Sequence, residues 1–111
     1  MAVQVQVLIA SKIAESTQTT QYTSTNVTTV IDKFTATNYD TSTRTISVNL
    51  VTSLDTPGNN NLTVKTKTLL PGETYTFPEI VGHILAAGGY ISTIASAAST
   101  INIRASGRVV S

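Results

Sequence analysis

The segment PGETYTFPEIVGHI, residues 71–84, holds the only histidine of the chain, His83, together with two carboxylates, Glu73 and Glu79. An imidazole and two carboxylates within eleven residues are side chains that can bind a metal or act as a general acid and base. A catalytic zinc site uses three protein ligands, however, and Glu79 and His83 would share a face only on a helix. Gly82 disfavours that helix. We therefore expect neither metal-ligating nor catalytic residues here.

The rest of the sequence also lacks a catalytic or cofactor-binding pattern. Neither a G-x-S-x-G elbow nor a Ser-x-x-Lys sequence occurs, so an activated serine is not expected. The chain has no cysteine, which excludes disulfides, thiol nucleophiles and cysteine-ligated metals. The Gly-Gly pair in AAGGY matches neither a phosphate loop nor a dinucleotide-binding fingerprint, and it predicts a turn. The sequence thus predicts a protein that is not an enzyme and needs no cofactor.

Composition and charge restrict the class of partner. Charged residues make up only 12% of the 111 residues, and the net charge is +1. The seven basic residues are dispersed, and only Lys65 and Lys67 share an expected strand face, so no nucleic-acid interface is expected. No apolar run approaches the roughly 20 residues of a membrane helix, and MAVQVQVLIASKI predicts a strand rather than a signal peptide. We expect neither nucleic acid nor a membrane among the partners.

Abundant threonine and hydrophobic alternation predict an all-β protein, because β-branched residues pack well on pleated sheets. Four segments alternate apolar and polar residues with period two. The residues expected to face inward are, segment by segment, Ile46, Val48 and Leu50; Ile101, Ile103 and Ala105; Val30, Phe34 and Ala36; and Leu62 and Val64. In the last segment, Thr63, Lys65 and Lys67 are expected on the opposite face. Seven or eight such segments, about one per dozen residues, predict one antiparallel β-sandwich or jelly roll over residues 1–111, Ig-like in size.

Turn residues separate these expected strands. NYDTST (38–43) and SLDTPGNNN (53–61) are rich in Asn, Asp and Gly, and Pro71 with Gly72 predicts a type II turn. EIVGHILAAG (79–88) has near-helical spacing, for which we expect one short turn at most. Residues 1–25, polar from residue 14 onward, predict an edge strand or an arm that orders on a partner.

Two non-enzymatic functions suit such a domain. The polar loops could contact sugars through Tyr39, Asp40 and Asn59, which makes a receptor- or glycan-binding module the alternative hypothesis. Structural assembly is the main one, because a small β domain has a limited core and its exposed strand edges can pair with other chains.

Four runs of the sequence are similar to one family of proteins: QTTQYTSTNVTTVIDKFTATN, TISVNLV, LLPGETYTFPEIVGHIL and GGYISTIASAASTINIRASGRVV. Over about residues 10–110, the chain resembles the small β-sandwich virion structural proteins of tailed bacteriophages, of the head-decoration and neck-collar type. The resemblance implies a virion component, assembled in the host cytoplasm, that decorates or cements the capsid or forms part of the neck or collar. It implies a homo-oligomer, with the homotrimer a common form, and major capsid, portal or neck proteins as partners. It transfers no catalytic residues.

Overall fold

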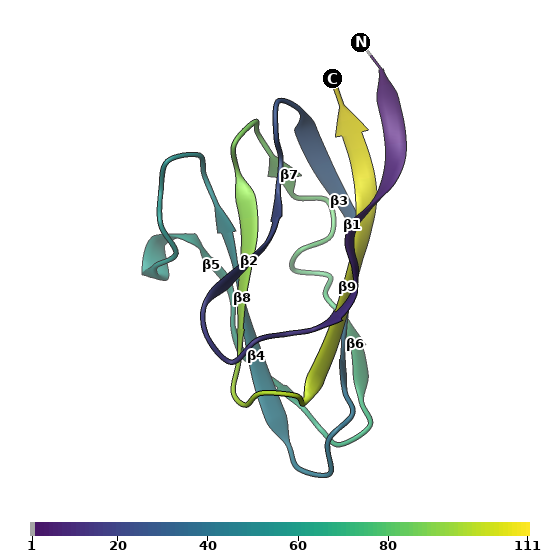
Figure 1. Ribbon diagram of the computed structural model, residues 1–111, viewed down its shortest axis with the longest axis vertical. Coiled ribbons are helices and arrows are strands. Elements are labelled where there is room, and N and C mark those ends of the chain that lie inside the picture. Colours follow the sequence, from purple (N-terminus) through teal and green to yellow (C-terminus); the bar gives the residue numbers. More distant parts are fainter. Residues whose placement is uncertain (1) are drawn as a thin grey trace.

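The computed structural model describes residues 2–111 as two antiparallel sheets packed face to face (Figure 1). The first sheet contains, in order, β1 (Val3–Ile13), β9 (Ile101–Val110) and β3 (Thr28–Asn38). Two short strands, β6 (Thr74–Thr76) and β7 (Ile84–Leu85), both pair with β3. The second sheet contains, in order, β2 (Thr19–Thr23), β8 (Tyr90–Ala95), β4 (Arg44–Val51) and β5 (Leu62–Leu69). A 3-10 turn, η1 (Asn59–Asn61), precedes β5. The expected all-β antiparallel sandwich is confirmed.

The strand order makes this sandwich a jelly roll. The chain first places β1 and β3 in one sheet and β2 and β4 in the other, and it later inserts β9 between β1 and β3 and β8 between β2 and β4. This is the arrangement of an eight-stranded double-sheet jelly roll. Residues 2–111 form nine strands, rather than seven or eight, because the seventh position is split into β6 and β7. Pro78 has no N–H for the sheet, and Gly82 with φ of 90° bends the chain between the two.

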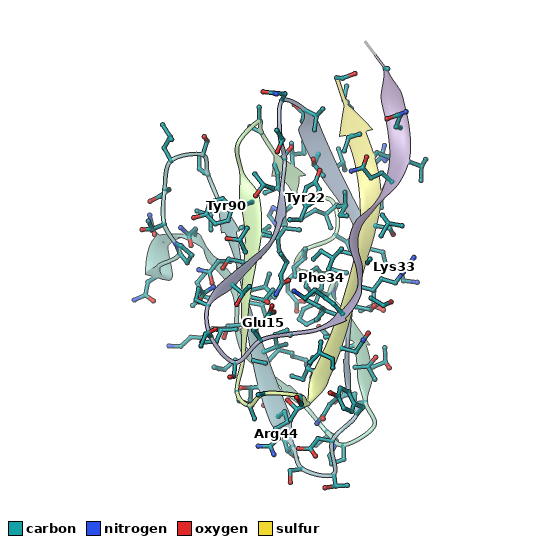
Figure 2. The ribbon with its side chains drawn as sticks, in the orientation of Figure 1. Glu15, Tyr22, Lys33, Phe34, Arg44 and Tyr90 are labelled. Carbon is teal, nitrogen blue, oxygen red and sulfur yellow. The ribbon has the colours of Figure 1, made fainter. Side chains whose placement is uncertain are left out.

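The core lies between the sheets. Phe34 and Phe77 are fully buried, and their ring centroids lie 5.3 Å apart in an edge-to-face arrangement. Phe34 points between the sheets, whereas its neighbour Lys33 points away from them (Figure 2). The alternation expected along β9 is confirmed, since Ile101, Ile103 and Ala105 are buried. Along β4 the expected core residues Ile46 and Val48 are buried, but Leu50 is only partly buried, and Ser47 and Asn49 on the other face are buried as well.

Two register shifts overturn part of the expected alternation. In β3 the pairing with β9 shifts between Ile31 and Lys33, so Ile31 is buried with Phe34 and Ala36 whereas Val30 is only partly buried. In β5 one extra residue lies between the partners of Ile46 and Val48 on β4, and Thr66 there has φ of 43°. Such a bulge reverses the direction of the side chains that follow it.

Lys67 therefore lies on the inner face with Leu69, not on the outer face as expected, whereas Lys65 is exposed. The two lysines do not share a strand face. The N-terminal residues form two edge strands, with β1 at the border of the first sheet and β2 at the border of the second. Within residues 2–111, no helix is long and apolar enough to cross a membrane.

Candidate functional site

Glu73 stabilises the turn at which residues 71–84 begin. Gly72 has φ of 79°, and the N–H of Glu73 donates to the carbonyl oxygen of Leu70 over 3.0 Å, as predicted for a type II turn. The Glu73 carboxylate accepts the N–H of Leu70 over 2.8 Å. The backbone N–H of Asn38 donates to the Glu73 carbonyl over 3.0 Å, which attaches the turn to the end of β3. Glu73 is therefore occupied as a turn residue.

Glu79 and His83 do not face one another across a helix. The backbone makes a single turn here, in which the N–H of Val81 donates to the carbonyl of Phe77 over 3.2 Å, and no helix follows. The Glu79 carboxylate accepts the hydroxyl of Tyr75 at 3.0 and 3.2 Å, and this hydrogen bond raises the pKa of Tyr75. His83 is exposed. In the described part of the chain, no group of three or more His, Asp or Glu side chains could hold a metal ion.

The aromatic residues of this segment pack against both sheets. The Phe77 ring meets the Tyr75 ring edge to face, with centroids 4.8 Å apart. From β5 in the opposite sheet, the Lys67 ammonium lies 4.1 Å from the centroid of Tyr75, within the range of a cation–π contact. These contacts close one side of the sandwich, which gives the segment a packing role.

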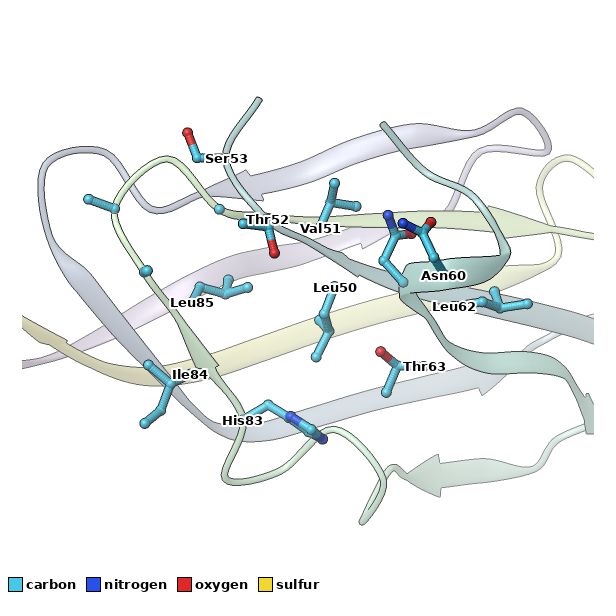
Figure 3. Close-up of a pocket in the computed structure, with 14 residues that line it drawn as sticks. Leu50, Val51, Thr52, Ser53, Asn60, Leu62, Thr63, His83, Ile84 and Leu85 are labelled. Atoms are coloured by element: carbon cyan, nitrogen blue, oxygen red, sulfur yellow. The ribbon is translucent and has the colours of Figure 1, made fainter. Parts of the chain in front are cut away.

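A cleft of about 440 Å³ opens between the β4–β5 side of the second sheet and the chain around β7 (Figure 3). Leu50, Leu62 and Leu85 are among the apolar residues that line it, and Asn60 and His83 are among the polar ones. The volume suits a small molecule. Among the described residues that line the cleft, His83 is nevertheless the only ionisable one, so these residues provide neither a metal-ligand set nor an acid–base pair.

The loop residues considered for sugar binding lie at opposite ends of β4. Tyr39 is half exposed, and Asp40 belongs to the turn before β4. A side-chain hydrogen bond from Arg44 lowers the pKa of Asp40, and the closest contact of their ion pair is 2.7 Å. Asn59 follows β4, whose eight residues span about 26 Å. Tyr39 and Asp40 therefore cannot form one binding site with Asn59.

The most distinctive surface lies on the first sheet, on the side away from the core. Val109, Ala105 and Ile103 of β9 are buried, so the alternating residues of β9 point outward. The register of β1 and β9 places Val3, Val5 and Val7 opposite Val110, Arg108 and Ser106, respectively, on this outer side. Val3 is 60%, Val5 84% and Val7 48% exposed.

Further aliphatic side chains extend this surface across the sheet. Val30 of β3 pairs with Arg108 on one side and with Ile84 of β7 on the other, and Ile84 is 64% exposed. We call this surface the aliphatic face; it consists of Val3, Val5, Val7, Val30, Ile84 and Val110. Arg108 lies between Val5 and Val30, so the aliphatic side chains surround one ion-paired residue. A group of exposed aliphatic side chains on one face marks a site of protein–protein contact more often than single exposed residues do. Sequence reasoning identified the strands but not this face.

Comparisons of the chain with protein-family models, with curated proteins and with solved structures find no match. The geometry of the described residues is therefore the basis for assigning a function.

Proposed function

We propose that the chain is a structural protein of a phage virion, which decorates or cements the capsid or forms part of the neck or collar through homo-oligomeric contacts. The observation that supports this proposal is the aliphatic face, with Val5 84% and Ile84 64% exposed. Covering such a face removes apolar surface from water, which favours association. Jelly rolls are common in viral capsid proteins, and this analogy of fold agrees with the proposal.

The partners of this protein are, in this proposal, further copies of itself and virion proteins such as the major capsid, portal or neck protein. Assembly takes place in the host cytoplasm, and the assembled protein resides in the virion. The proposal includes no catalytic step, and the separate positions of His83, Glu73 and Glu79, each in its own contact or facing solvent, agree with it.

A virion pull-down tests this function. The tagged chain is incubated with purified capsids, portals and neck complexes, and the bound material is quantified by mass spectrometry and imaged by electron microscopy. The proposal predicts ordered attachment to one of them and an oligomer in native mass spectrometry. A chain that is monomeric and binds none of the three would contradict it. Ile84→Lys, which places a charge on the aliphatic face, should reduce attachment, whereas Leu54→Lys, at a fully exposed loop position, should not.

A second candidate, a glycan-binding module displayed on the virion, is favoured by one feature. A shallow cleft of about 220 Å³ on the second sheet has three amides in its lining, Gln18, Asn49 and Asn59, beside the apolar residues Pro57, Leu62 and Ile94. A glycan array distinguishes this candidate from the first. Binding that is lost in Asn59→Ala and kept in Tyr39→Ala would support it, and an array without any bound glycan would reject it.

A further inference from the structure

The free edge of β1 presents a regular row of unpaired backbone groups. Ala2 and Ser111 exchange two hydrogen bonds, of 3.3 and 3.0 Å, so this pair belongs to the hydrogen-bonded class of an antiparallel ladder. The register continues without a shift to Val7, and hydrogen-bonded pairs alternate along it. Gln4 and Gln6 therefore bond to β9. Val3, Val5 and Val7 direct their N–H and C=O groups away from β9, toward the outer border of the sheet.

No strand of residues 2–111 pairs with this border, and in Figure 1 the N-terminal half of β1 lies at the upper right with no segment beyond it. Natural proteins protect exposed strand edges with charges, prolines, bulges or short lengths. The other edges here show such protection: β5 has exposed Lys65 and a bulge, β2 has a register shift after Thr20, and β6 and β7 have three and two residues. Residues 3–8 of β1 contain no charge, proline or glycine.

The sequence of this edge is symmetric about Val5. Residues 3–7 read Val-Gln-Val-Gln-Val in both directions. Antiparallel pairing with an identical strand would place valine opposite valine and glutamine opposite glutamine. The five residues are uncharged, so a second copy meets no like-charge repulsion. Cross-strand pairs of β-branched residues are also favourable in sheets.

We propose that two copies of the chain pair through β1, antiparallel about a two-fold axis at Val5, and so join their first sheets into one continuous sheet. This inference rests on the self-assembly part of the proposed function and specifies its contact. Val5 lies opposite Val5 of the second copy, and Val3 lies opposite Val7. Each of these three valines donates one backbone hydrogen bond and accepts one, so the pairing forms six.

The surrounding structure fits this register. The ladder between β1 and β9 first shifts between Val7 and Ile9. This is just beyond the pair that Val7 forms with Val3, the first residue of β1, in the second copy. Lys12 lies beyond the paired region. On the outer side, the three valines of each copy meet and make the two aliphatic faces continuous. On the other side, Gln4 and Gln6 are exposed and can form amide hydrogen bonds across the axis. The two-fold axis predicts dimers or assemblies of even number, rather than a homotrimer built on this edge.

Single cysteines test the register directly, because the chain has no cysteine of its own. In Val5→Cys the two Cα atoms would lie about 5.5 Å apart across the axis, within the range of a disulfide. In Val3→Cys they would lie roughly 14 Å apart, which is too far. We expect a disulfide dimer on mild oxidation of Val5→Cys, little in Val3→Cys or Val7→Cys alone, and a mixed disulfide when these last two are combined.

Equal cross-linking of Val3→Cys and Val5→Cys, or none in Val5→Cys, would overturn the pairing. Native mass spectrometry of the unmodified chain distinguishes self-assembly in general from pairing through β1. An oligomer without the Val5→Cys disulfide would reject the β1 edge but retain self-assembly, and a monomer would reject both. Val5→Lys, at a side chain that is 84% exposed, should abolish the dimer and keep the circular dichroism spectrum of the folded chain. Leu54→Lys, on an exposed loop, should leave the dimer intact.

Discussion

Arg108 and Asp32 form a bidentate ion pair on the outer side of the first sheet, with Nη2 2.9 Å from Oδ1 and Nε 3.0 Å from Oδ2. In the register of the sheet, Arg108 lies between Val5 and Val30, so this pair is located within the aliphatic face. The hydrogen bond from Arg108 lowers the pKa of Asp32 and raises that of Arg108, which keeps both groups charged and mutually neutralised. A guanidinium without this partner would place a net charge within an apolar contact.

Asp32→Asn should therefore weaken self-association while changing the stability of the single chain little, because the ion pair is exposed. The measurement is the dissociation constant from sedimentation equilibrium, compared with the thermal midpoint of unfolding. Asp40→Asn is the matched control. It also removes the partner of an arginine, Arg44, but in the β3–β4 turn rather than on the aliphatic face. Equal weakening by both variants would show that the location of Asp32 has no special importance.

Acid should destabilise the fold slightly, through the small contributions of three solvent-accessible carboxyl groups. Arg108 lowers the pKa of Asp32, Arg44 lowers that of Asp40, and Gln21 followed by Lys12 lowers that of Glu15. The unfolded chain then binds protons at a higher pH than the folded chain does. The stabilisation is complete above about pH 5, and it is lost as the pH falls through the lowered pKa values.

Urea unfolding at a series of pH values measures this effect. The urea concentration at the midpoint of unfolding should decrease once the pH is below about 4. Glu15→Gln should reduce this dependence on pH because one of the three groups is absent. A midpoint that is constant from pH 7 to pH 3 would contradict the role of these contacts. The three ion pairs would then contribute nothing measurable to stability.

The sequence predicted the sandwich because hydrophobic alternation and the positions of turn residues agreed along most of the chain. Ile46, Val48, Ile101 and Ile103 alternate with polar residues and are buried, and the Pro71–Gly72 turn has the expected geometry. The two errors of strand face, at Val30 and Lys67, have a common physical cause. A bulge adds one residue to a strand and exchanges its faces, as at Thr66, and composition does not show where this occurs.

The candidate surface was harder to predict than the fold. Val3, Val5 and Val7 alternate with glutamine, as the inward-facing residues of an ordinary half-buried strand would. Their exposure follows from their position on the outer side of β1 and from a tertiary arrangement that leaves that side uncovered. The symmetry of Val-Gln-Val-Gln-Val is visible in the sequence, but its relevance depends on β1 being an edge.

Gly107 should not tolerate a side chain. A Cβ atom at this position of β9 would overlap the carbonyl oxygen of Val30 and crowd Leu8. Gly107→Ala must therefore displace β3 or β1, and we expect a loss of about 1–3 kcal/mol in the free energy of unfolding. Gly58→Ala is the control, since Gly58 has an extended φ of −167° and is exposed. Chemical denaturation of both variants measures the difference, and similar stabilities would contradict the close approach of β9 and β3.

Phe77 and Ile84, both in the segment 71–84, should separate the effects of mutation on folding from those on assembly. Phe77 is fully buried against Phe34, so Phe77→Ala should cost about 3–5 kcal/mol of stability. Ile84 is 64% exposed on the aliphatic face, so Ile84→Ala should leave the unfolding midpoint nearly unchanged and weaken attachment to the partner. Urea unfolding and the virion pull-down measure the two effects. A large loss of stability in Ile84→Ala would show that this side chain belongs to the core.

Amide hydrogen exchange along β1, followed by NMR at increasing protein concentration, shows residue by residue whether copies assemble through this edge. The N–H groups of Gln4 and Gln6 bond to β9 in a single chain and should be protected at every concentration. Those of Val3, Val5 and Val7 should exchange rapidly in dilute protein and become protected as copies associate, with loss of that protection in Val5→Lys. Association without any change in exchange at these three valines would contradict assembly through β1.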